Sequence, residues 1–237
     1  MESGVSEIQS QKIRKAINYG FDRQKMMTYL RNGIGIPANG GFIPKGLPSF
    51  HNLKGYSYQP DKARQYINAY KNETGDQTPE ITITTNSQYV DLCEFIQREL
   101  EKIGLRVNVD VVPPSTLRQS KASSKLPIFR ASWVADYPDG ENYLSLFYSK
   151  NFAPNGPNYM NYKNCEFDKL YEKVFVTNDV QERLKLYRQM DSLVIEDAPI
   201  VPLYYDQFVR FSLKNITGLT TNPINLLNLK KVSKAPK

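Results

Sequence analysis

Hydrophobic residues recur at helical spacing along much of the chain, and this pattern predicts most of its secondary structure. The predicted helices cover residues 8–31, 58–72, 88–105, 115–124, 165–175 and 179–197. The first of them is expected to break near Gly20 and Asp22, where the apolar spacing is interrupted. Gly104 predicts a left-handed cap after the third helix, and Asp179 with Glu182 has capping-box spacing at the start of the last.

Strands are predicted where apolar residues alternate with polar ones or form a nearly continuous run. Ile81 and Ile83 alternate with threonines, and residues 105–112 show the same period of two. The largely apolar run at 126–134 predicts a buried strand, and residues 198–213 contain two shorter strand-like runs. Strands that alternate with helices at this spacing predict crossover connections, and therefore an α/β fold with a mainly parallel sheet.

Residues 33–50 form a long connection rich in glycine and proline. Apolar residues recur through it, which predicts an ordered loop rather than a tight turn. Its glycines follow a helix instead of a strand, and no Lys-Ser or Lys-Thr pair trails them. Neither a P-loop nor a dinucleotide-binding fingerprint is therefore expected.

Length and charge narrow the classes of protein. The 237 residues suit one large domain or two small ones. The formal net charge is +7, but the basic residues are either interleaved with acids or gathered near the C-terminus, as at Lys230 and Lys231. A nucleic-acid face needs a clustered basic stripe with stacking aromatics, so no nucleic-acid partner is expected. The sequence contains no run of eighteen apolar residues, so no membrane span is predicted. Its polar N-terminus does not resemble an export signal.

Cysteine and histidine are scarce. Cys93 and Cys165 lie far apart without metal-ligand spacing, and Cys93 is predicted to be a buried free thiol. Because His51 is the only histidine, a catalytic triad or a His-rich metal site would have to be built around that single residue. We expect no metal, no cofactor and no triad.

The only tryptophan, Trp133, comes three residues before Asp136, at the C-terminal end of the predicted buried strand. Ligands of open α/β sheets tend to bind at that end of the strands. A carboxylate beside an indole suits a ligand ammonium group, through a charge-assisted hydrogen bond and an aromatic surface. A hydrolase with Asp136 and Glu141 as general acid and base is the competing interpretation, although Asp139 and Glu141 on a Pro-Gly turn are typical turn formers.

Arg130 lies six residues before Asp136 on the same predicted strand. Its guanidinium group would complement a ligand carboxylate. Regular alternation would point its side chain to the same face as Ser132 and Val134, and opposite to Trp133.

Several segments, taken together and in their order, resemble one protein family. They read IRKAINYGFDRQKMM, GIGIPANGGFIPKGLPSF, YQPDKARQYI, FIQRELEKIGLRVNVDVV, ASWVADYPDGENYLSLFYSKN, EFDKLYEKV and ERLKLYRQMDSLVIEDAPIVPLYY. The set is similar to the C-terminal part of the oligopeptide/dipeptide-type extracytoplasmic solute-binding proteins, called family 5. These are the substrate-capturing subunits of bacterial ABC importers, and the similarity covers nearly the whole chain.

The resemblance implies a bilobed receptor that closes on its ligand. The expected fold is a type II periplasmic-binding-protein-like C-terminal lobe, with a mainly parallel or mixed central sheet flanked by helices. Residues 1–203 would form the ligand-binding lobe, and residues 204–237 would return to an N-terminal lobe that this chain is expected to lack, together with the export signal. Such receptors are not enzymes. They work in the periplasm or at the outer face of the cell membrane and deliver oligo- or dipeptides to ABC permease subunits.

On the family pattern W-x-x-D-Y, the resemblance assigns Asp136 to the peptide's α-amino group, next to Trp133. The backbone of Ser132–Val134 would pair with the extended peptide as an added strand, and Arg130 would assist the ligand carboxylate. Since some relatives carry nickel complexes, haem or sugars, a non-peptide cargo is the alternative. Residues 204–228 would lack their partner strands, which predicts poor packing on the lobe and a route to dimerisation.

Overall fold

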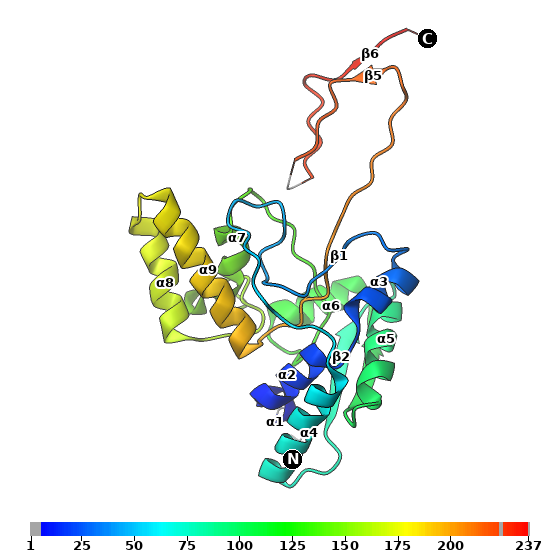
Figure 1. Cartoon of the computed structure of the whole chain (residues 1–237), viewed down its shortest axis with the longest axis vertical. Helices are drawn as coiled ribbons and strands as arrows, with labels where there is room; N and C mark the ends of the chain where they lie inside the picture. Colours follow the sequence, from blue (N-terminus) through cyan, green and yellow to red (C-terminus); the bar gives the residue numbers. More distant parts are fainter. Residues whose placement is uncertain (1–5, 223–224, 237) are drawn as a thin grey trace.

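Two parallel strands form the centre of the first half of the molecule, in a computed structural model that describes residues 6–222 and 225–236 (Figure 1). The strands are β2 (Glu80–Thr85) and β3 (Arg106–Val111), and helix α5 (Val90–Glu101) connects them. Ile81 pairs with Val107, and both side chains are buried against α5 and its neighbours. The predicted crossover from strand to helix to parallel strand is confirmed.

The third predicted strand is reduced to a single bridge at Phe129. The N–H of Thr84 donates to the carbonyl of Ile128 at 3.0 Å, and the N–H of Arg130 donates to the carbonyl of Thr84 at 2.9 Å. Because β2 ends at Thr85, one residue after Thr84, there is no further strand residue with which the chain beyond Arg130 could pair. The prediction of a buried strand over 126–134 is therefore wrong: only Phe129 bridges to β2, and none of residues 126–134 is buried.

Four helices pack around the sheet. They are α1 (Ser6–Gln9), α2 (Gln11–Tyr19), α3 (Arg23–Leu30) and α4 (Pro60–Thr74). The predicted break near Gly20 and Asp22 separates α2 from α3 and is confirmed, with Asp22 accepting a hydrogen bond from the N–H of Lys25 at 3.0 Å. A Cβ atom at Gly20 would lie 2.6 Å from the side chain of Leu100, so glycine permits the close approach of this break to α5.

The sheet and these helices enclose the first hydrophobic core. Its buried members are Ile13, Ala16, Ile17, Phe21, Met26, Met27, Ala63, Ile67, Tyr70, Ile81, Ile83, Leu92, Cys93, Ile96, Leu100, Ile103, Leu105 and Val107. Cys93 is a buried free thiol, as predicted. Gly104 adopts a φ of 88°, which confirms the left-handed cap after α5.

A second hydrophobic core lies under a helical layer in the other half of the molecule. Its elements are α7 (Glu141–Leu144), the short 3₁₀ turns Ser145–Phe147 and Ser149–Asn151, α8 (Cys165–Val176) and α9 (Val180–Asp197). Its buried members are Ile43, Leu47, Leu144, Leu146, Phe147, Tyr162, Phe167, Tyr171, Val174, Leu186, Tyr187, Met190 and Val194. Asp179 accepts from the N–H of Glu182 at 2.7 Å, which confirms the predicted cap of α9. The single-turn helix α7 was not predicted, since one turn shows no helical periodicity.

A segment that follows α9 returns across the first half of the molecule. Its strand β4 (Tyr204–Tyr205) pairs antiparallel with β1 (Ile36–Pro37). The guanidinium group of Arg23, 2% exposed, fixes this segment by donating to the carbonyl of Pro202 at 2.6 Å and to that of Asn18 at 2.9 Å. Carbonyl dipoles and the ring of Phe21 therefore replace the water that this buried cation loses.

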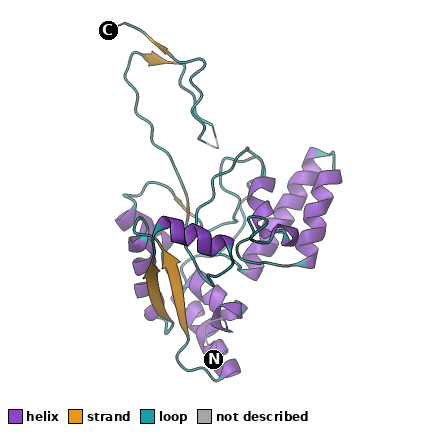
Figure 2. Ribbon diagram, turned by 180° about the vertical axis from the view of Figure 1, so that it is seen from behind, coloured by secondary structure: helices purple, strands orange, loops and turns teal. Residues whose placement is uncertain are grey.

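The chain beyond β4 projects away from both cores as a long extended segment (Figures 1 and 2). It carries the short antiparallel pair β5 (Ile216–Thr217) and β6 (Ser233–Lys234). We predicted that the terminal segment begins at residue 204. Tyr204 and Tyr205 pair with β1, and Gln207 still accepts a hydrogen bond from the N–H of Gly35 at 3.3 Å before the chain projects away. No helix among the described residues combines the length and apolar character that a bilayer crossing needs.

Candidate functional site

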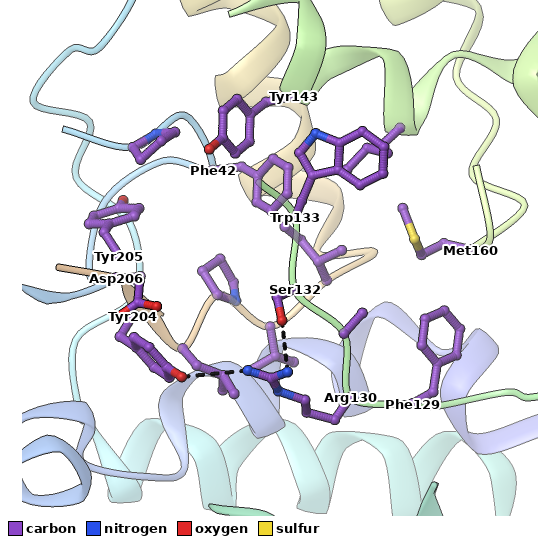
Figure 3. Close-up of a pocket in the computed structure, with 18 of the residues that line it drawn as sticks. Phe42, Phe129, Arg130, Ser132, Trp133, Tyr143, Met160, Tyr204, Tyr205 and Asp206 are labelled. Carbon is purple, nitrogen blue, oxygen red and sulfur yellow. Dashed lines mark hydrogen bonds between the residues drawn. The ribbon is translucent and has the colours of Figure 1, made fainter. Parts of the chain in front are cut away.

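A cavity of about 630 Å³ lies between the two cores. The first core contributes the side chains of Ile81, Ile83, Cys93 and Ile96, and the second contributes residues around Leu146. The loop that contains Phe42, the extended segment 127–135 and the returning segment 198–208 complete its wall (Figure 3). Apolar and aromatic side chains dominate this lining, as is typical of a small-molecule or peptide site.

Residues 127–135, called the lining segment below, cross this cavity in an extended conformation without becoming a strand. Beyond Arg130, the main-chain N–H and C=O groups of Ser132, Trp133 and Val134 make no hydrogen bond within the described part of the chain. An extended backbone with free donors and acceptors can pair with another extended chain. The predicted residues Ser132 to Val134 are thus placed on the cavity wall with an unpaired edge.

Arg130 is half-buried and holds the first end of that edge. Its Nη1 donates to the hydroxyl of Ser132 at 2.8 Å and its Nη2 to that of Tyr204 at 3.5 Å (Figure 3). The guanidinium carbon lies 3.2 Å from the ring centroid of Tyr89. Its Nε has no hydrogen-bond partner, and no carboxylate of the described residues forms an ion pair with it. A cation fixed in this way is available to an anionic group of a ligand.

Trp133, the middle residue of the edge, is also fixed. Its indole ring packs against the second core, and Nε1 donates to Oδ1 of Asn142 at 2.9 Å. The same Asn142 oxygen accepts from the main-chain N–H of Asp136 at 3.3 Å. One buried amide therefore sets both the indole and the turn that carries the carboxylate.

Asp136 is exposed and does not belong to the residues that line the cavity. Its neighbours Val134 and Ala135 do line it, and Val134 is 62% exposed. Among the described residues, none forms an ion pair or a hydrogen bond with the Asp136 carboxylate. The structure therefore leaves this carboxylate free, one residue beyond the end of the cavity wall.

Glu141, which the hydrolase interpretation pairs with Asp136, is occupied. The hydroxyl groups of Tyr137 and Tyr171 both donate to its carboxylate. The bond from Tyr171 ties α8 to α7, and burial together with this bond raises the pKa of Tyr171, which keeps its hydroxyl a donor. A carboxylate held by two phenols is a structural acceptor, and this arrangement does not favour a general acid–base pair.

A buried carboxylate positions the glycine-rich loop on the cavity. Asp191 of α9 is 1% exposed and accepts from the N–H of Phe42 at 2.6 Å. Burial raises the pKa of Asp191 to about 6, and the main-chain N–H groups of Phe42 and Ile43 partly oppose that shift. The loop passes so close that a Cβ atom at Gly41 would lie 2.0 Å from Oδ2 of Asp191. The sequence predicted an ordered loop here, but no pattern pointed to the carboxylate that holds it.

Several residues of the site had no signal in the sequence. Phe42 lines the cavity from a loop, Tyr143 from α7, and Tyr204 and Tyr205 from β4, while Lys121 reaches it from α6 (Pro114–Ala122). His51 lies 3.9 Å from Asp191, and burial lowers its pKa, so it is a neutral neighbour near pH 7. Across residues 6–222 and 225–236, no cluster of three His, Cys, Asp or Glu side chains is arranged to hold a metal ion.

Comparison with known proteins gives a consistent result. The family model described as "Bacterial extracellular solute-binding proteins, family 5 Middle" matches residues 6–155. The glutathione-binding protein GsiB of Salmonella typhimurium is 26% identical over 218 residues, which cover 90% of this chain and 42% of GsiB. The chain therefore spans less than half the length of this relative.

Solved structures agree. The periplasmic binding protein DppA of Helicobacter pylori, in complex with the peptide STSA, matches 97% of this chain and 45% of its own, with a TM-score of 0.81 and 26% identity. A dipeptide-binding protein of Pseudoalteromonas sp. SM9913, in complex with Met-Leu, matches 96% of this chain and 46% of its own, with a TM-score of 0.77 and 25% identity. The expected type II periplasmic-binding-protein lobe is confirmed, and the chain belongs to family 5 of the bacterial extracellular solute-binding proteins.

Proposed function

We propose that this chain is the C-terminal ligand-binding lobe of a receptor that captures peptides for an ABC importer. The observation that carries the proposal is the unpaired extended backbone of Ser132–Val134 along the cavity wall. A peptide added there as a strand would satisfy those groups whatever its side chains are. Relatives solved with the peptides STSA and Met-Leu support the same ligand class.

The termini of the peptide supply the charges that would orient it. The free carboxylate of Asp136 would accept the α-amino group, and the cation of Arg130 would face a carboxylate. Trp133 would act by fixing the edge, since its Nε1 is already bonded to Asn142. Residues 206–237 would pack on an N-terminal lobe of the complete receptor, which would work in the periplasm or at the outer face of the membrane with ABC permease subunits.

A single lobe should bind its ligand weakly. An exposed ion pair at Asp136 contributes about 0–1 kcal/mol, and each solvent-facing hydrogen bond of the edge adds roughly 0.5–1.5 kcal/mol. Association costs on the order of 4–15 kcal/mol of translational and rotational freedom. Burial of the ligand between two lobes would strengthen the same contacts by excluding water.

The test is a titration of the isotope-labelled chain, followed by nuclear magnetic resonance, with Ala-Ala-Ala in free, N-acetylated and C-amidated forms. We expect shifts at the amides of Ser132–Val134, dissociation constants in the millimolar range, and up to about fivefold weaker binding of the N-acetylated form. Asp136→Asn should remove that difference. The matched change Asp110→Asn, at an exposed acid of β3 outside the cavity, should keep it.

The same titration separates the alternatives. Equal affinity for the free and acetylated peptides would remove the role of Asp136 and leave the peptide class intact. Shifts with a nickel chelate, haem or a sugar, and none with any peptide, would assign a non-peptide cargo. Hydrolysis of the peptide, lost in Asp136→Asn, would replace the receptor with an enzyme. Fusion of a matching N-terminal lobe should tighten peptide binding to micromolar or better.

A further inference from the structure

Positively charged residues outnumber negatively charged ones around the cavity. Those of the described chain that line it are Arg14, Lys45, Lys121, Arg130 and, as the only acid, Asp206. The Asp206 carboxylate is exposed and accepts from the main-chain N–H of Gln207 at 2.9 Å. Arg14 donates to main-chain carbonyls, including that of Asp197 at 2.9 Å, so its charge is already solvated by the protein. Lys121 and Arg130 are the half-buried cations that remain without an anionic partner.

Lys121 is held in place by aromatic rings. Its Nζ lies 5.7 Å from the ring centroid of Phe129 and 5.4 Å from that of Tyr159, so the ammonium group faces both π systems. The Lys121 ammonium group makes no hydrogen bond and no ion pair within residues 6–222 and 225–236. Burial and the positive charges of Arg130 and Arg118 lower the pKa of Lys121. This lysine therefore occupies a site where its charge is unfavourable without a ligand.

Some half-buried cations elsewhere in the molecule have a carboxylate partner, whereas Lys62 donates only to the hydroxyl of Tyr19. Arg31 pairs with Asp91 at 2.8 Å, and Lys15 pairs with Glu196 at 2.5 Å. Two unpaired cations in one cavity are costly to the folded state, because each is partly desolvated and repels the other. A ligand carboxylate next to each cation would relieve both effects.

We propose that Lys121 and Arg130 form an anion-binding subsite, which gives the cavity a preference for peptides that carry a side-chain carboxylate. The inference rests on the proposed peptide function and names Lys121 as a specificity-determining residue. Arg130 links the subsite to the unpaired edge through its bond to Ser132, so a peptide paired with that edge passes next to both cations. One cation takes the terminal carboxylate and the other takes the acidic side chain.

The experiment compares isosteric peptides on matched variants. Ala-Glu is titrated against Ala-Gln, and Glu-Ala against Gln-Ala, at low and high salt, with the amides of the lining segment as the readout. In the unchanged protein we expect at least one glutamate peptide to bind about fivefold more tightly than its glutamine partner, with the preference reduced by salt. Lys121→Met keeps a flexible apolar stem between the rings and should abolish the preference. Lys125→Met, at an exposed lysine outside the cavity, should retain it.

A second titration tests the subsite without any peptide, with glutarate and its monoamide as ligands. Glutarate should shift the same amides more strongly than the monoamide, and only while Lys121 is present. Equal binding of all glutamate and glutamine peptides would overturn the subsite and leave the peptide function standing. Binding of glutarate in a Lys121-dependent manner, with no peptide bound, would support the subsite and remove the peptide function. No response to either class of ligand would overturn both.

Discussion

The body of the molecule, residues 6–205, and its terminal segment, residues 206–236, contain similar apolar residues and bury them very differently. Phe147 in the body is 0% exposed, whereas Phe211 in the terminal segment is 91% exposed. Phe147 meets Phe42, Tyr162 and Phe167 edge-on, with ring centroids 5.1–6.1 Å apart. The difference shows that partner surfaces, and not the residues themselves, decide which apolar positions become a core.

Among the described residues of the terminal segment, seven large apolar side chains are exposed. The exposed ones are Phe208, Val209, Phe211, Leu213, Leu226, Leu227 and Leu229. Polar contacts within the segment are local, such as that between Arg210 and Asn225 at 2.6 Å and the pair β5–β6. A group of exposed apolar side chains of this size is typical of an interaction site. The second lobe of a receptor would cover it, as proposed above, and a second copy of the chain is the alternative.

The largest difference in stability should appear when the two phenylalanines compared above are each replaced by alanine. Phe147→Ala removes a fully buried ring and leaves a cavity, so we expect it to lower the free energy of unfolding by about 3–5 kcal/mol. Phe211→Ala should change it by less than about 0.5 kcal/mol, because an exposed ring loses no packing. Denaturant unfolding, followed by the fluorescence of Trp133, measures both. Similar losses for the two variants would show that the terminal segment is packed in solution.

A smaller effect separates a buried carboxylate of the body from an exposed one of the terminal segment. The pKa of Asp191 is raised to about 6 in the folded protein, whereas the unfolded chain has the ordinary value of 3.8. Between these two values the folded state binds the extra proton, so its stability falls as the pH rises from about 4 to 6 and is then constant. We expect the wild type to lose about 1–3 kcal/mol relative to Asp191→Asn over this range.

The control for this pH effect is Asp206→Asn, which removes an exposed carboxylate instead of a buried one. His51 acts in the opposite direction, since its lowered pKa makes the protein gain stability as the pH rises toward about 6.5. That contribution cancels between the wild type and Asp206→Asn. Because His51 lies 3.9 Å from Asp191, the comparison with Asp191→Asn is made in a His51→Gln background. Parallel stability curves for the wild type and Asp191→Asn would contradict the burial argument.

Deletion of residues 206–237 should have only a small effect on stability. Strand pairing of β1 with β4 and the bond from the Tyr205 hydroxyl to the carbonyl of Gly41 at 2.5 Å both stay in the shortened chain. We expect the free energy of unfolding to change by less than about 1 kcal/mol, and any self-association seen by light scattering to disappear. A dimer that survives the deletion would place its interface on the body.

Periodicity alone located the helices and the crossover because each of them buries one continuous face. Leu92, Ile96 and Leu100 recur every fourth residue and lie in the first core. The break at Gly20 and the caps at Gly104 and Asp179 were equally predictable, since they depend on the chemistry of one residue and its near neighbours. Resemblance to a family placed the lining segment at a ligand site, and the geometry of that segment had to come from the structure.

The contacts that join distant parts of the chain were decided by tertiary structure. The run at 126–134 has the composition of a strand, but only the length of β2 determines that pairing stops at Arg130 and leaves a free edge. In the same way, Asp191 is an ordinary helix residue by pattern, and its burial beneath the loop at Phe42 alone makes it an anchor. The sequence by itself determined which segments are helical and which faces are apolar, because those are local properties. The cavity, its unpaired backbone and its unbalanced charge arise only when segments far apart in the chain meet.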